Sequence, residues 1–298
     1  MDMKLFAIDL DGTLLHSDHT ISKENVLAIK KRQEQGDLVL IATGRASFDA
    51  QNILRKHHIF GCPIIASNGA ELQYKIDDRV LRNNTSMDRQ TSERILRYLS
   101  EEEVYVQIYL EDKILLESEA TDILLAKIEK ERVLNQSFSA DLFLHSIQAQ
   151  LTQYGVEYVD SITPNDLSCV IKFMIVSPNQ GLLKKIERRL SLINTCSISS
   201  SGVYNLEVMS VGINKGSALI KVATDCNIEL SNTIAIGDNQ NDLSMFQIAG
   251  SSVAMKNAEE SIKSIATYET LDNEHSGVAH ALNDYPANLL NQLKRASV

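Results

Sequence analysis

The chain has 298 residues, 44% of them hydrophobic and 23% charged, which is the composition of a globular protein with enough apolar material for a core. Its formal net charge of −10 at pH 7 argues against nucleic acid as a partner, because phosphate backbones are bound mainly through Lys and Arg. A small phosphorylated ligand is not excluded, since a local site can be cationic in an acidic protein.

Cysteine spacing and hydropathy exclude further classes. The four cysteines are far apart and form no CxxC metal or redox motif, so we expect free thiols in a reducing compartment. The first residues, MDMKLFAID, lack the architecture of a signal peptide. No apolar run approaches the ~20 residues that a membrane-spanning helix needs. We therefore expect a soluble, cytoplasmic protein with no membrane partner.

The first part of the chain alternates between apolar runs and helical patterns. Apolar runs at 4–8, 38–42 and 63–66 predict short strands that are buried on both faces. Residues 22–35 and 47–57 are predicted to be helices. A chain that alternates strand and helix in this way predicts a parallel sheet with helices on both faces.

The pattern changes after Gly69. Alternating apolar residues predict a hairpin within 103–117, and a long helical region is predicted for roughly 120–153. The other predicted elements here are helices at 86–99 and 180–192, a strand at 170–176, and one or two strands within 197–209. This middle region is therefore predicted to be α+β material inserted into the first pattern.

The parallel pattern resumes near residue 208. Helices are predicted at 215–226 and 243–249, and strands at 233–236 and 252–255. The sequence therefore predicts an α/β protein with a Rossmann-like parallel-sheet core. The core would consist of residues 1–83 and 208–298, and an α+β cap domain of residues 84–207 would be inserted between them.

Polar motifs follow four of the predicted core strands. They are Asp9-Leu10-Asp11-Gly12, Thr43-Gly44-Arg45, Ser67-Asn68-Gly69, and the stretch from Asp238 to Asp242. Ligands of open α/β sheets bind beyond the carboxyl ends of the strands, so we expect these motifs to converge.

Each motif also has a plain structural explanation. Asp9-Leu10-Asp11-Gly12 resembles a turn, but an unpaired charge at the end of an apolar strand is costly, and two carboxylates suit a hard cation such as Mg²⁺. Thr43 and the amides after it either form a simple turn or bind phosphate oxygens at a helix start. The 237–242 loop lacks the remaining ligand positions of a calcium-binding EF-hand. Lys215 taken alone resembles a solvated lysine.

Together the motifs resemble a known family. IDLDGTL at 8–14, Thr43, Lys215 and GDNQND at 237–242 occur in the order of the four motifs of the haloacid dehalogenase-like hydrolases. SNGA at 67–70, VAMKNA at 253–258 and SGVAHAL at 276–282 are similar to the Cof-type branch, which carries a large α/β cap (class IIB) between the second and third motifs.

The resemblance implies a Mg²⁺-dependent phosphatase, a phosphoric monoester hydrolase that forms an aspartyl-phosphate intermediate. Its substrates would be small phosphorylated metabolites, either sugar phosphates or phosphorylated cofactors. By this resemblance Asp9 is the nucleophile and a metal ligand, and Asp11 is the general acid/base and binds the metal through its backbone carbonyl. Asp238 is a further metal ligand, and Asp242 supports the metal shell. The phosphate is bound by the side chains of Thr43, Lys215 and Asn241 and by the amides near Leu10 and Gly44.

Two other functions stay open at this stage. Some relatives with similar caps are sugar phosphomutases, and the same fold could serve as a non-catalytic sensor of a phosphorylated ligand. Lys256 stands where the family usually has glycine, and we expect an exposed lysine there rather than a strained one. Asn205 and Glu207 lie near the return to the core, and we expect them to be strand residues that face solvent rather than substrate.

Overall fold

The structure is a computed structural model that describes residues 3–76, 79–102 and 104–284. Contacts divide the chain into two compact units. The first unit contains the described residues of 1–43, 50–82 and 214–298, and the second contains 44–49 and 83–213. The chain thus returns to the first unit at Asn214, whereas the sequence predicted a boundary at 208, and the short segment 44–49 groups with the second unit.

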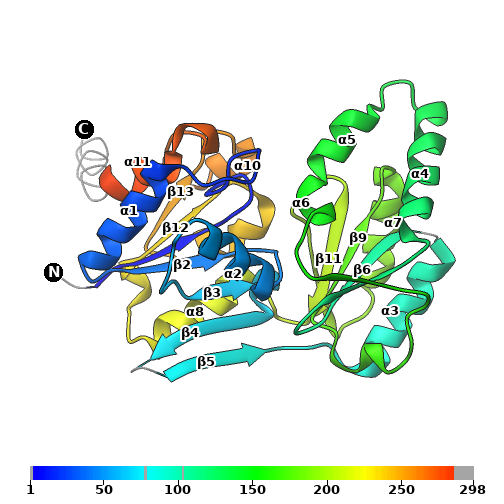
Figure 1. Cartoon of the computed structure of the whole chain (residues 1–298), viewed down its shortest axis with the longest axis horizontal. Coiled ribbons are helices and arrows are strands. Elements are labelled where there is room, and N and C mark those ends of the chain that lie inside the picture. Colours follow the sequence, from blue (N-terminus) through cyan, green and yellow to red (C-terminus); the bar gives the residue numbers. More distant parts are fainter. Residues whose placement is uncertain (1–2, 77–78, 103, 285–298) are drawn as a thin grey trace. The chain divides into compact units, whose positions relative to one another are not determined.

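An eight-stranded sheet forms the centre of the first unit, in the order β14-β13-β12-β1-β2-β3-β4-β5 (Figure 1). The strands from β14 to β3 pair in parallel, and β4 joins β3 antiparallel. Their bounds are β1 Leu5–Ile8, β2 Leu38–Ala42, β3 Ile64–Ala66, β4 Glu71–Ile76, β5 Arg79–Asn84, β12 Thr233–Gly237, β13 Ser251–Ala254 and β14 Tyr268–Glu269. This sheet confirms the predicted α/β class with a parallel core.

Helices cover both faces of this sheet because side chains alternate along each strand. In β1, Phe6 and Ile8 enter one hydrophobic cluster, and Leu5 and Ala7 enter the other. Helices α1, α2 and α11 contribute to the first cluster and α8, α9 and α10 to the second. Their bounds are α1 Lys23–Glu34, α2 Ser47–Lys56, α8 Lys215–Asp225, α9 Leu243–Phe246, α10 Glu260–Lys263 and α11 Gly277–Asp284.

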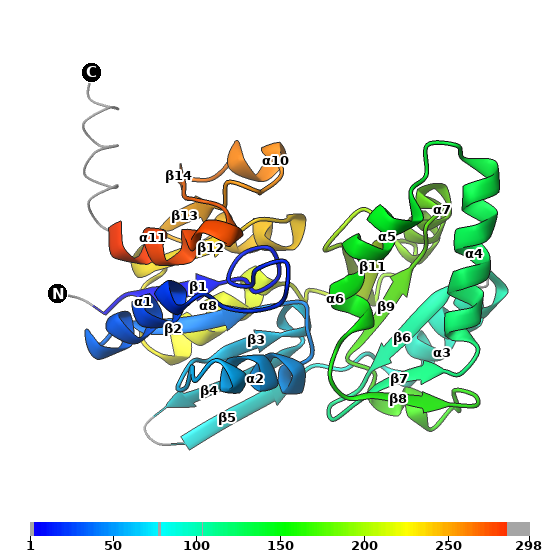
Figure 2. The same cartoon turned by 45° about the horizontal axis from the view of Figure 1, so that its top comes forward.

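The second unit has its own six-stranded sheet, in the order β10-β11-β9-β6-β7-β8 (Figure 2). All neighbouring pairs are antiparallel except β7 with β8. The bounds are β6 Tyr105–Tyr109, β7 Ile114–Glu117, β8 Val156–Val159, β9 Lys172–Val176, β10 Cys196–Ser199 and β11 Asn205–Ser210.

Two helices of the second unit, α3 and α7, bury apolar side chains against one face of that sheet. Ile95 and Leu99 of α3 join Ile186 and Leu190 of α7 in this hydrophobic cluster. The helices of the unit are α3 Arg89–Glu102, α4 Ala120–Leu134, α5 Ala140–Ser146, α6 Gln148–Leu151 and α7 Gln180–Leu190. Across the described residues, none of the helices is both long and apolar enough to cross a membrane.

Short 3₁₀ turns complete the described chain. They are η1 Ser67–Gly69, η2 Asp166–Cys169, η3 Leu230–Asn232, η4 Gln240–Asp242 and η5 Asn273–His275. Turns η1 and η4 follow directly on β3 and β12, so they occupy the carboxyl ends of two parallel strands.

The predicted elements differ from the observed ones mainly at the inserted region and the sheet edge. The single helical region predicted for 120–153 is three helices, because Asn135 and Ser137 form a local turn and Ser139 caps the start of α5. Strands β4 and β5 were not predicted. Every residue of β5 is exposed, so this strand carries no apolar alternation that a sequence pattern can detect.

Candidate active site

The ends of β1 and β12 meet because these strands are neighbours with parallel register, Ile8 facing Ile236. Asp9 continues β1, and its backbone N–H donates to the Ile236 carbonyl at 3.0 Å. Asp238 is the first residue after β12. The sheet therefore brings the first and fourth predicted motifs together, as the strand-end argument expected.

Gly12 lets the loop after β1 close against Asp238. Its φ is +77°, and a Cβ at this position would lie 2.5 Å from Oδ2 of Asp238. The Thr13 hydroxyl then donates to Oδ1 of Asp238 at 2.7 Å. A side chain at residue 12 would therefore meet both backbone strain and a clash with the Asp238 carboxylate.

Lys215, the first residue of α8, lies between two carboxylates. Asn214 caps the helix, since its side chain accepts from the Ser217 N–H. The Lys215 ammonium donates to Oδ1 of Asp9 at 2.6 Å and to Oδ1 of Asp242 at 2.7 Å, and it is 0% exposed. The burial of Lys215 excludes the solvated lysine that the residue suggests when taken alone, and the phosphate-binding role that the family resemblance implies for it stays a prediction.

The second oxygen of Asp242 organises the loop after β12. Oδ2 of Asp242 accepts from the backbone N–H groups of Asp238 at 3.0 Å and of Asn239 at 3.1 Å. The Asp242 side chain is fully buried. One carboxylate thus fixes both the Lys215 ammonium and the backbone that carries Asp238.

The cluster has a surplus of negative charge. One carboxylate oxygen from each of Asp9, Asp238 and Asp242 lies within 4.8 Å of the others. With all groups ionised, three carboxylates and the Lys215 ammonium leave two negative charges. Carboxylate oxygens are the ligands of hard divalent cations, so the donor set and its charge fit an ion such as Mg²⁺.

Burial of this surplus shifts the acid–base equilibria. It raises the pKa of the Asp9 carboxyl well above its ordinary value, although Lys215 opposes the shift. It raises the pKa of the Asp238 carboxyl to about 7, and the Asp242 carboxylate adds to this effect. Burial lowers the pKa of Lys215, but Asp242 and Asp9 outweigh it and hold that pKa above its usual range. Lys215 is therefore cationic, and the carboxyls favour a second cation.

The second predicted motif lies at the end of β2. Thr43 is buried, its N–H donates to the Ile65 carbonyl at 2.8 Å, and its carbonyl accepts from the Asn68 N–H at 3.0 Å. Gly44 follows and is half-buried. The phosphate-binding roles predicted for Thr43 and for the amides near Leu10 and Gly44 stay predictions.

Asp11 and Asn241 complete the predicted set. Asp11 is half-buried, and its carboxylate is not part of the Asp9, Asp238 and Asp242 group. The roles predicted for its carboxyl and its backbone carbonyl stay predictions. Asn241 lies in η4, and its Nδ2 donates to Oδ1 of Asn68 at 3.2 Å. Asn68 has no individual role among the sequence predictions, although the Ser67-Asn68-Gly69 motif was predicted to lie at a strand end.

Asn205 and Glu207 are not exposed, so the expectation that they face solvent is wrong. In β11 of the second unit both are at least 97% buried. Glu207 pairs with the buried Lys172 at 3.1 Å, and Asn205 donates to the Ser201 hydroxyl at 2.7 Å. Lys172 and Glu207 are each the single charged residue of a largely apolar strand, a pattern that indicates a buried ion pair.

Lys256 is exposed, as expected, and it is absent from the described residues that have a positive φ. The backbone therefore places no strain on a side chain here. Its neighbour Asn257 donates to the Gly12 carbonyl at 2.8 Å and supports the loop after β1.

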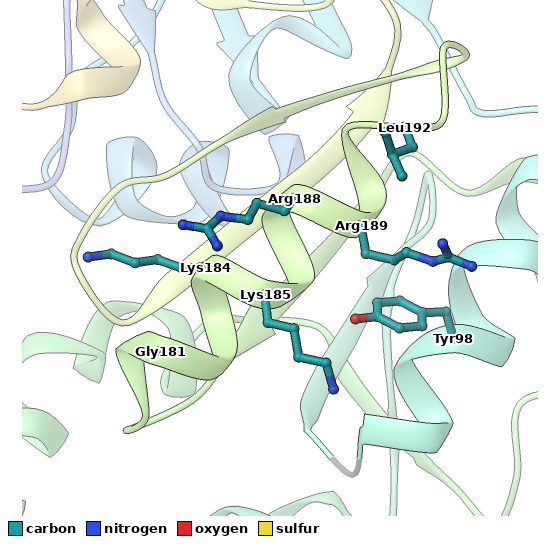
Figure 3. Close-up of a pocket in the computed structure, with 7 residues that line it drawn as sticks. All are labelled: Tyr98, Gly181, Lys184, Lys185, Arg188, Arg189 and Leu192. Atoms are coloured by element: carbon teal, nitrogen blue, oxygen red, sulfur yellow. The ribbon is translucent and has the colours of Figure 1, made fainter.

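A surface hollow of about 640 Å³ lies on the second unit, at α7 and α3. Its lining residues are Tyr98, Gly181, Lys184, Lys185, Arg188, Arg189 and Leu192. Figure 3 shows Lys184 and Arg188 extending to one side of α7, and Lys185 and Arg189 to the other, toward Tyr98. These four cations are exposed and Lys185 pairs with Glu102 at 2.7 Å, so the hollow is a solvated basic surface without buried reactive groups.

Comparisons with known proteins agree with the geometry. A model of the haloacid dehalogenase-like hydrolase family matches residues 6–282. The 5-amino-6-(5-phospho-D-ribitylamino)uracil phosphatase YwtE of Bacillus subtilis is 33% identical over 287 residues, which cover 94% of this chain and 97% of that protein. A solved haloacid dehalogenase-like hydrolase from B. subtilis has a TM-score of 0.81 at 32% identity and covers 95% of this chain and 100% of its own.

A subclass IIB sugar phosphatase has a TM-score of 0.74 at 20% identity, covering 95% of this chain and 99% of its own. This likeness concerns the fold, including the presence of an inserted cap.

Proposed function

The chain belongs to the haloacid dehalogenase-like hydrolases, as its motifs predicted, and is a phosphatase; we propose that it hydrolyses phosphate monoesters of small metabolites through an aspartyl-phosphate intermediate with the help of Mg²⁺. The observation that carries this proposal is the cluster of Asp9, Asp238 and Asp242 around the buried Lys215. A carboxylate that attacks a phosphate meets like-charge repulsion, and this cluster holds one buried cation and the ligands for a second.

In the first step an oxygen of Asp9 attacks the phosphorus, and the bond from phosphorus to the leaving alcohol breaks. The leaving oxygen takes its proton from Asp11. The Lys215 ammonium, held 2.6 Å from Asp9, neutralises charge on the transferring group. Asp11 lies two residues after Asp9, in the loop that follows β1, and we assign it to the leaving group while Asp9 attacks.

In the second step Asp11 accepts a proton from water, and the water oxygen attacks the phosphorus of the aspartyl phosphate. The bond between phosphorus and Asp9 breaks, and inorganic phosphate leaves. Asp9, the Asp11 backbone carbonyl and Asp238 would hold Mg²⁺, with Asp242 supporting the shell. When bound, this ion supplies charge neutralisation at the phosphoryl oxygens.

We propose a phosphorylated polyol or sugar, free or attached to a cofactor precursor, as the substrate class. The printed name of the B. subtilis relative describes a ribityl phosphate carried by a pyrimidine, and that relative aligns with 94% of this chain. We further propose that the second unit contributes to the choice of the leaving group.

The test is phosphate release from a panel of sugar phosphates, phosphorylated cofactors and nucleotides, with and without Mg²⁺. We expect Mg²⁺-dependent turnover that Asp9→Asn abolishes. The control is Asp112→Asn, which removes an exposed aspartate of the second unit and should leave turnover unchanged. Turnover that survives in Asp9→Asn would refute the assignment of the nucleophile.

The panel also separates the alternatives. A phosphomutase would return an isomerised sugar phosphate rather than free phosphate, so product analysis by NMR distinguishes it. The non-catalytic sensor is not retained, because the family relatives are phosphatases and Asp9, Lys215 and Asp238 are all present.

The four cysteines are free thiols, which supports our proposal that the enzyme works in the reducing cytoplasm.

A further inference from the structure

The turn η1 between β3 and β4 has an unusual backbone. Its three residues, Ser67, Asn68 and Gly69, have φ values of +46°, +55° and +107°. All three residues are buried. A positive φ is unfavourable for residues other than glycine, and such strain persists only where surrounding contacts impose it.

Contacts on every side hold this turn. The Ser67 hydroxyl donates to Oε2 of the buried Glu71 at 2.6 Å. The Asn68 N–H donates to the Thr43 carbonyl at 3.0 Å. A Cβ on Gly69 would lie 2.5 Å from the carbonyl oxygen of Asn214, so the turn lies against the residue that precedes Lys215.

The Asn68 side chain extends these contacts to the fourth motif. Its Oδ1 accepts a hydrogen bond from Nδ2 of Asn241 at 3.2 Å. A carboxamide nitrogen carries two N–H groups, whereas its oxygen can only accept. An acceptor at Asn68 therefore determines which end of the Asn241 amide faces it, and it leaves the second N–H of Asn241 to donate elsewhere.

We propose that Asn68 is a positioning residue for phosphate binding. It orients the Asn241 amide so that an N–H, rather than the oxygen, is presented to the phosphoryl group. The inference rests on the proposed function, in which Asn241 binds phosphate. This positioning role explains why the η1 turn retains its unfavourable φ values. The turn contacts Thr43, Asn241 and the residue before Lys215, all of which belong to the proposed phosphate-binding motifs.

The variant Asn68→Gly tests this directly. It removes the acceptor and keeps a residue that adopts a positive φ without strain, so the fold should be retained. The matched control is Asn227→Gly, since Asn227 is an exposed asparagine with a φ of +55° beyond the far end of α8. The measurements are melting temperature, the inhibition constant of inorganic phosphate, and its dissociation constant by calorimetry with Mg²⁺ present.

We expect Asn68→Gly to weaken binding of inorganic phosphate about tenfold, which is the usual effect of one lost hydrogen bond to a charged group. Asn227→Gly should bind phosphate as the wild type does. In an Asn241→Ala background, Asn68→Gly should have little further effect, because the group it orients is gone.

Two results would overturn the inference. One is wild-type phosphate binding in Asn68→Gly, and the other is an equal loss in the presence and absence of the Asn241 side chain. The calorimetric measurement needs no turnover. If the wild type released no phosphate from any substrate, the proposed function would fail while the role of Asn68 would still be tested.

Discussion

Among the described residues, each unit of this protein buries one lysine completely, and the two lysines differ in their charge balance. Lys172 of the second unit pairs with Glu207 at 3.1 Å, and its ammonium lies 4.1 Å from the centre of the Tyr109 ring. Lys215 of the first unit contacts two carboxylates, Asp9 and Asp242, with Asp238 close to both.

The difference separates two uses of a buried charge. Lys172 and Glu207 neutralise each other, so their environment requires no further ion. The Lys215 cluster retains two negative charges when all its groups are ionised, and either an added cation or protonation of Asp9 and Asp238 reduces this charge. Surplus charge, rather than burial alone, therefore distinguishes the candidate active site from the buried pair of the second unit.

The largest expected effect breaks the balanced pair. Lys172→Met leaves Glu207 buried without its cation, and we expect a loss of about 3–5 kcal/mol in the free energy of unfolding. The double variant Lys172→Met with Glu207→Gln removes both charges and should recover most of that loss. Urea unfolding of the two single variants and the double variant measures the coupling. If the two losses simply add, the pair does not stabilise the unit through charge balance.

Replacing Lys215 should mainly lower the catalytic rate, whereas replacing Lys172 should mainly lower the free energy of unfolding. Lys215→Met removes the cation that we propose neutralises the phosphoryl group, and we expect kcat to fall by about 10²–10³-fold. The control is Lys221→Met, which removes a half-exposed lysine of the same helix and should leave kcat within twofold or so. A Lys215→Met enzyme with near wild-type kcat would contradict the catalytic use of the surplus cluster.

Much of this arrangement is predictable from sequence. Apolar runs that end in Asp9, Thr43 and Asp238 identify the parallel strands and the edge where ligands bind, because both features depend on local pattern. The apolar runs carry no information on edge strands such as β5, whose side chains are all exposed.

The partners of the buried charges were harder to predict. Lys172 and Glu207 are 35 residues apart, and only the antiparallel order β11-β9-β6 brings them together. Asn68 was similarly missed, since its contact with Asn241 joins residues 173 positions apart through the meeting of two strand ends. Pattern reasoning finds residues at strand ends but not the pairs that sheet topology creates.

The effect of Mg²⁺ on thermal stability tests whether the Lys215 cluster binds the added cation. A divalent ion that binds only the folded state at one hundred times its dissociation constant would stabilise the protein by about 2.7 kcal/mol. We expect Mg²⁺ to raise the melting temperature of the wild type and to have a much smaller effect on Asp238→Asn. Asp18→Asn, at an exposed aspartate, is the control and should respond as the wild type does. Equal Mg²⁺ responses in all three proteins would place the cation elsewhere.

The smallest expected effect extends the comparison of the two units to their thiols. Cys62 of the first unit packs against the core and accepts a hydrogen bond from Gln33 at 3.4 Å, and burial raises its thiol pKa to about 12. Cys169 of the second unit is exposed. With this pKa, Cys62 stays protonated at pH 8.5. Because the thiolate is the reactive form, Cys62 should be alkylated at least about a hundredfold more slowly than Cys169.

Iodoacetamide labelling followed by peptide mass spectrometry measures both rates, with the urea-unfolded protein as the control in which the rates should converge. Equal rates in the folded protein would mean that the first unit opens around Cys62 faster than the reagent reacts, and would set a limit on the local stability of the core that carries Asp9 and Lys215.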